Sequence, residues 1–173
     1  TAYLFWLSVL GTIIVIPLTF FFDLKFPRNF RSIVHFPISA TFGMLIPFAV
    51  LYSIATKLPA GVLTLTLTLA PAFTYFLSFL FRIEPFRWLS IVAICSGAFG
   101  VLLIVLPETS VPGKNASYWL LFGLLAPIAA ATNNLVVALF RPPDSHSLVL
   151  VGSVMLSATL LMFPIMLSLD GFV

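Results

Sequence analysis

Two long apolar runs separated by a short charged turn constrain this chain more than any other feature. The runs lie between Pro59 and Glu108, and the turn between them, residues 82–87, has the sequence RIEPFR. Each run holds about 20 residues, which is the length of helix that crosses a hydrocarbon core of ~30 Å. Soluble proteins seldom bury two adjacent helices of that length. The stretch therefore predicts a transmembrane hairpin.

The composition of the whole chain supports a membrane protein. Of its 173 residues, 61% are hydrophobic and 8% are charged, whereas soluble domains contain about 25% charged residues. The net charge of +3 is divided among loops, so it does not indicate a nucleic-acid partner. The single cysteine, Cys95, lies in an apolar run and cannot form a disulfide framework or a cysteine-rich zinc site. We expect no metal and no cofactor.

Six apolar segments bounded by charge, Pro and Gly predict an all-α polytopic membrane helix bundle of about six transmembrane helices. They cover residues 2–22, 33–56, 60–81, 87–107, 117–140 and 147–169. The loops after the first, third and fifth segments hold six basic residues, against two in the alternate loops. Because basic loops stay in the cytoplasm, these three loops are predicted to be cytoplasmic.

The first and last segments share a pattern of residues. Thr12, Pro17 and Asp23 in the first segment match Thr159, Pro164 and Asp170 in the last. The loop charges predict that the two segments run in opposite directions, as inverted-topology repeats require. The match therefore indicates an internal inverted repeat.

The transmembrane hairpin also resembles a known family. It has Pro59-Ala60-Gly61 at its start, Ala70-Pro71 inside its first helix, Glu84 in the turn, and Trp88 and Gly97 in its second helix. These features are similar to those of the EamA-type transporters of the drug/metabolite transporter superfamily, although Arg82-Ile83-Glu84 stands where that family usually has Gly-Glu.

The resemblance implies two repeats of five helices, of which this chain would hold helices two to seven as an excerpt of a longer protein. Residues 1–108 would be the remainder of the first repeat (four helices), 109–116 an outer loop and 117–173 the start of the second repeat (two helices). The resemblance also implies that the second, third and fifth segments line the substrate route.

Neutral polar residues on one helical face give the first candidates for solute binding. Thr64, Thr68, Pro71 and Tyr75 follow i, i+4, i+7, i+11 spacing on the third segment and so share a face. Pro71 removes one helical hydrogen bond, which predicts a kink beside a cavity. The alternative is that the Thr hydroxyls only bond to carbonyls of their own helix.

The second and fifth segments supply the other candidates, Ser39, Asn133 and Asn134. An amide in hydrocarbon needs a partner on another helix or in a wet cavity, so each Asn predicts either solute contact or a bond between helices. His35 stands alone, and we expect it to be interfacial. Ala93 and Gly97 on the fourth segment form a small-residue pattern that predicts helix packing.

We therefore predict a membrane transporter and not an enzyme, because the segments hold no nucleophile-and-base pair. As the resemblance implies, it would export a small organic metabolite such as an amino acid by alternating access. Its expected partners are the lipid bilayer and the solute, with a homodimer allowed, in the plasma membrane (the inner membrane of a bacterium). Two alternatives stay open, namely a membrane enzyme whose catalytic residues lie outside this excerpt and a non-transporting fragment or assembly partner.

Overall fold

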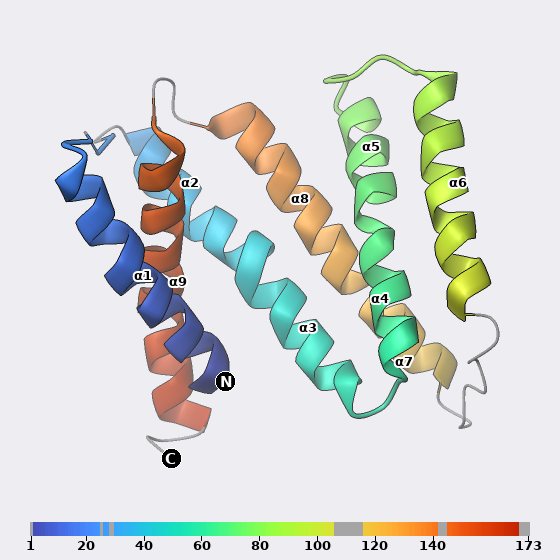
Figure 1. Cartoon of the computed structure of the whole chain (residues 1–173), viewed down its shortest axis with the longest axis horizontal. Coiled ribbons are helices and arrows are strands. Elements are labelled where there is room, and N and C mark those ends of the chain that lie inside the picture. The colour runs from blue at the N-terminus through green and yellow to red at the C-terminus, as the bar shows by residue number, and fades with distance from the viewer. Residues whose placement is uncertain (1, 25, 28–29, 106–115, 142–144, 170–173) are drawn as a thin grey trace. The chain divides into compact units, whose positions relative to one another are not determined.

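The protein is helical throughout the part that the structure describes (Figure 1). The computed structural model describes residues 2–24, 26–27, 30–105, 116–141 and 145–169. Its elements are α1 (Ala2–Phe21), α2 (Phe30–Ala40), a π-helical turn η1 (Thr41–Leu45), α3 (Ile46–Ala55), α4 (Ala60–Thr68), α5 (Ala70–Leu80), α6 (Trp88–Val105), α7 (Ala116–Gly123), α8 (Leu125–Phe140) and α9 (Ser147–Leu169).

Five segments are long and apolar enough to cross a membrane, namely Tyr3–Phe21, Ser32–Ala55, Ala60–Leu80, Tyr118–Phe140 and Ser147–Ser168. These confirm five of the six predicted segments. The predicted fourth segment corresponds to α6, which is shorter than the other five. Most of the predicted outer loop, residues 109–116, lies outside the described residues.

Large apolar side chains cover the outside of these helices. Ile13 and Ile14 on α1 are each 61% exposed, and Leu89 on α6 is 81% exposed. In water such a surface would be strongly unfavourable, whereas lipid chains solvate it. The predicted all-α, polytopic membrane bundle is confirmed.

Three of the long segments are interrupted shortly before a proline. The π-helical turn η1 precedes Pro47, the break at Leu69 between α4 and α5 precedes Pro71, and the break at Leu124 between α7 and α8 precedes Pro127. Proline has no N–H, so the carbonyl four residues earlier loses its usual donor and the helix deforms there. An interruption of the helix at Leu69 is therefore present near Pro71, where a kink is predicted.

The chain divides into two compact units, and the first comprises residues 1–45 and 136–173. In it, α1 packs along α9 (Figure 1). The ring of Phe5 lies 6.2 Å from that of Phe163, and a Cβ added to Gly152 would lie 3.2 Å from Cγ1 of Val15. Residue numbers thus rise along α1 as they fall along α9, so the two helices are antiparallel.

The matched threonines of the first and last segments meet in this unit. Oγ1 of Thr12 lies 3.4 Å from Oγ1 of Thr159, and each hydroxyl also donates to a carbonyl one turn earlier in its own helix. Pro17 and Pro164 lie inside α1 and α9 without ending them. Asp170 lies outside the described residues.

The second unit comprises residues 46–135, and its core lies between α3, α4 and the α7–α8 segment. The buried residues of this core are Val50, Ile54, Leu58, Val62 and Ala126. These units group helices by contact and not by repeat, so the division into repeats at residues 108 and 117 stays a prediction.

A capped turn joins α5 to α6 in the second unit. Arg82 follows α5 with a φ of 56°, and the N–H of Ile83 donates to the carbonyl of Ser78 at 2.8 Å. This is a Schellman-type end, in which a left-handed residue lets the chain leave the helix. The hydroxyl of Tyr75 accepts a hydrogen bond from the N–H of Arg87 at 2.7 Å, which ties the end of the turn back to α5.

Candidate solute site

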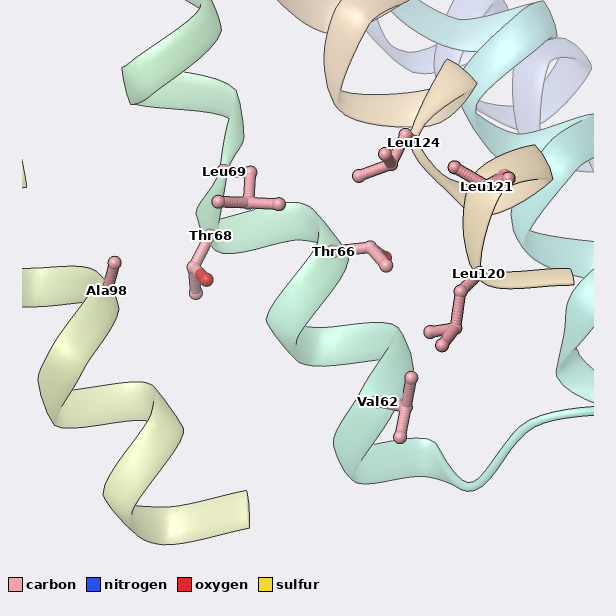
Figure 2. A pocket seen from close by; sticks show the side chains of 8 residues that line it. All are labelled: Val62, Thr66, Thr68, Leu69, Ala98, Leu120, Leu121 and Leu124. Carbon is pink, nitrogen blue, oxygen red and sulfur yellow. The ribbon is translucent and has the colours of Figure 1, made fainter. Parts of the chain in front are cut away.

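Two of the helix breaks line the same cavity. Leu69, at the break between α4 and α5, and Leu124, at the break between α7 and α8, both contact a space of about 290 Å³ in the second unit (Figure 2). The remaining lining residues are Val62, Thr66, Thr68, Ala98, Leu120 and Leu121. Both breaks are one-residue irregularities in otherwise helical backbone, because Leu69 has φ −77° and ψ −12° and Leu124 keeps hydrogen bonds to Leu120 and from Ile128.

Two threonine hydroxyls are the polar side-chain groups of this lining. Thr66 extends from α4 towards the leucines of α7, and Thr68 lies between α4 and Ala98 of α6 (Figure 2). Thr66 is 4% exposed and donates to the carbonyl of Leu63 at 2.7 Å. This bond uses the hydroxyl proton and leaves oxygen lone pairs that can accept a bond from a solute.

A second hollow adjoins the first through shared residues. It has a volume of about 570 Å³, and Thr68 and Ala98 line both spaces. Pro71 and Gly97 line the second one. A Cβ added to Gly97 would meet no atom of the described residues within 4 Å. The described residues therefore place no helix against Gly97, and its role in helix packing stays a prediction.

The lining of both spaces carries no charged side chain. Such a site selects by shape, apolar contact and a small number of hydrogen bonds. Pro71 cannot donate to the carbonyl of Leu67, and a backbone N–H at the end of α4 bonds to this carbonyl instead.

The predicted stripe on the third segment does not stay on one face of a single helix. Thr68 and Pro71 line the second hollow, but Thr64 is exposed and donates to the carbonyl of Gly61 at 2.7 Å. Tyr75 lines a separate apolar hollow between α5 and α6, and its hydroxyl bonds to the turn. The break at Leu69 separates Thr64 and Thr68 on α4 from Tyr75 on α5.

The predicted asparagines lie on α8. Nδ2 of Asn134 donates to Oγ1 of Thr74 at 3.1 Å, and Thr74 donates in turn to the carbonyl of Ala70 at 2.8 Å. Asn134 therefore bonds α8 to α5, which is the inter-helix alternative. Oδ1 of Asn133 is buried and has no hydrogen-bond partner among the described residues.

Ser39 belongs to the first unit. It is 3% exposed, and its Oγ lies 3.5 Å from Nε2 of His35. His35 is itself 3% exposed, so it is buried within the protein, and it lies three residues after the start of the span Ser32–Ala55. Ser39 is part of the first unit, and the residues that line the two cavities above are part of the second.

Two residues that sequence reasoning missed are Thr66 and Thr74. Thr66 lies outside the i, i+4 spacing that joins Thr64 and Thr68, yet it lines the cavity with Thr68. Thr74 lies one turn after Ala70. Its hydroxyl donates a hydrogen bond to the carbonyl of Ala70 and accepts one from Asn134 on another helix. Its position shortly after Pro71 was a usable signal.

No group of three or more His, Cys, Asp or Glu side chains that could hold a metal occurs in the described ranges. Cys95 is a free, exposed thiol. The helices and their apolar outer surface define a multi-pass integral membrane protein.

The comparison with known families agrees with this class. The profile of the EamA-like transporter family matches residues 1–106, and the chain belongs to that family. No curated protein and no solved structure matches the chain.

Proposed function

We propose that this chain is part of a carrier that exports a small organic metabolite, such as an amino acid or a related compound, across the plasma membrane. The observation that carries the proposal is the meeting of two proline-associated helix breaks, at Leu69 and Leu124, at one uncharged cavity. Interrupted helices form the substrate sites of many secondary transporters, and the one-residue irregularities at Leu69 and Leu124 are a milder form of this feature.

Alternating access is the mechanism that these features support. The antiparallel packing of α1 on α9 and the contact between Thr12 and Thr159 are compatible with two inverted halves related by an axis through that contact. In such carriers, one half rocks against the other around a central site. We infer that the cavity at the two breaks is a part of that site.

The hydroxyls of Thr66 and Thr68 would recognise the solute in this proposal. Both line the cavity, and the wall is otherwise apolar, so the solute would be held by shape and by one or two hydrogen bonds. A lost hydrogen bond to a neutral group lowers affinity by about five- to tenfold. This magnitude is large enough to measure in a transport assay.

The test is solute counterflow into proteoliposomes that contain the full chain, with a panel of radiolabelled amino acids and related metabolites. Thr66→Val and Thr68→Val keep the side-chain volume and remove the hydroxyl. We expect either variant to raise the KM for the transported solute about five- to tenfold. Thr64→Val is the matched control, because Thr64 is exposed and bonds to its own helix, and its KM should stay unchanged.

Failure to exceed protein-free liposomes for every solute would overturn the transport proposal. Transport with equal KM values in all three variants would instead remove the two threonines from the site while leaving the transport function intact.

A further inference from the structure

A row of buried polar side chains on α2 lies outside the cavities described above. Ser32, His35 and Ser39 have exposed fractions of 0%, 3% and 3%. Their i, i+3, i+7 spacing places them on one face of the helix. The row lies in the first unit, where α2 packs against α9.

Two atoms of this row have no hydrogen-bond partner among the described residues, namely Oγ of Ser32 and Nδ1 of His35. Nε2 of His35 lies 3.5 Å from Oγ of Ser39. A buried polar atom that lacks a partner is costly, and a bound water or ion is the usual reason for finding one in a native structure. Two such atoms on adjacent turns of one helix are therefore placed to bind a shared ligand.

Spacing indicates what this ligand is. Residues three apart on a helix have Cβ atoms about 5–6 Å apart, a separation that one water molecule bridges. A water between Oγ of Ser32 and Nδ1 of His35 would give both atoms a partner. If the ring proton is on Nε2 and directed at Ser39, Nδ1 presents a lone pair to that water.

We propose that Ser32, His35 and Ser39 form a proton-binding site. A water between Ser32 and His35 passes a proton from hydronium to the Nδ1 lone pair, and water is left behind. Release follows the same path in reverse. Ser39 accepts the Nε2–H bond and fixes the orientation of the ring.

The described elements that pack against α2 bring no ionisable group to the ring, and on α2 itself Arg31 lies one turn before His35. η1, α9 and residues 136–140 of α8 contribute no Asp, Glu, Lys, Arg or His. The nearest such residues in the sequence of these elements are Arg141 and His146, both exposed, and Arg31 on α2 itself. A cavity of about 320 Å³ between α2 and the end of α8 also contacts His35.

This inference goes beyond solute transport, because a proton site exists or fails whatever the solute is. Ionisable side chains inside membrane spans are expensive and usually serve ion or proton pathways. The described spans hold no other histidine, since His146 precedes α9. The proposal therefore gives this carrier a means of using a proton gradient.

The experiment is nitrogen NMR of the unmodified chain in lipid nanodiscs with ¹⁵N-labelled histidine, at a series of pH values. The variant His146→Gln assigns the signals, because it leaves His35 as the remaining histidine. We expect His35 to be the Nε2–H tautomer when neutral, to show contact between its ring and bound water, and to take up a proton at Nδ1 as the pH is lowered.

Ser32→Ala tests the water. This variant removes the hydroxyl that bonds to the water. The loss of one hydrogen bond should change the midpoint of the His35 titration by about half to one pH unit. Ser8→Ala is the control, because Ser8 is equally buried in the same unit and donates to its own helix at Phe5.

Three results would overturn the proposal. They are an Nδ1–H tautomer, a ring that stays neutral down to about pH 4.5 in a range where free histidine is charged, and a titration that Ser32→Ala leaves unchanged. The first two are measured on the unmodified sequence, so they decide the matter even if Ser32→Ala fails to fold.

Discussion

Gly123, the last residue of α7, packs against the core of the second unit more closely than any larger residue could. A Cβ added there would lie 3.0 Å from Cδ1 of Ile54 and 3.5 Å from Cγ2 of Thr66. The first distance is shorter than the optimal carbon–carbon contact of about 3.5–4.0 Å. Ile54 is fully buried, so it has little room to move. We therefore expect Gly123→Ala to destabilise the protein.

The magnitude follows from two opposing effects. Overpacking costs about 1–3 kcal/mol, and the better helix propensity of Ala returns up to about 1 kcal/mol. The net loss should be about 0.5–2 kcal/mol. Ile54→Val removes the Cδ1 atom that the new methyl would meet, and alone it should cost about 0.5–1.5 kcal/mol.

A double-mutant cycle isolates the contact. The double variant Gly123→Ala/Ile54→Val should be about as stable as Ile54→Val alone, which gives a coupling of about 1 kcal/mol. Unfolding in mixed detergent micelles can be followed by the fluorescence of Trp119, which packs against this core. Additivity of the two single changes within about 0.5 kcal/mol would show that the contact is absent.

Three further predictions test other features. Arg82→Gly should stabilise the chain by about 1–2 kcal/mol, because φ at this residue is 56° and glycine adopts that conformation without penalty. Arg82→Ala should give no such gain in stability when it is measured by the same unfolding assay. A cycle of Asn134→Ala and Thr74→Val should give a coupling of about 0.6 kcal/mol, the average for bonds between membrane helices, and zero coupling would contradict the 3.1 Å bond. Gly97→Ala should leave counterflow unchanged, whereas Gly97→Phe should fill the second hollow and abolish it; equal rates would exclude this hollow from the solute path.

The sequence was sufficient to predict the class of fold, because apolar runs of membrane-spanning length are a strong signal. The interruption before Pro71 was also predictable from proline chemistry alone. The break at Leu124 follows from the same chemistry at Pro127, but Pro17 and Pro164 show that proline does not always end a helix. Whether it does so depends on the neighbours that can replace the lost hydrogen bond.

The candidate site was harder to predict, since side-chain direction depends on helix regularity and on packing. The stripe of Thr64, Thr68 and Tyr75 assumed one uninterrupted helix, and the break at Leu69 removed that assumption. A lone histidine near the end of an apolar segment has no sequence pattern that shows which way it faces. The packing of α2 on α9, a contact between residues more than a hundred positions apart, buries His35, and one sequence cannot show such a contact.

The pairing of α1 with α9 also sets an order of assembly during synthesis. The second unit is one continuous stretch, so its helices can associate as soon as they leave the ribosome and enter the bilayer. By contrast, α1 must stay in lipid without its main partner until α9 has been made. At common elongation rates this delay is roughly ten seconds. During this time the helix surface at Gly11, which later packs close to Met155, is accessible to chaperones or to helices of other proteins.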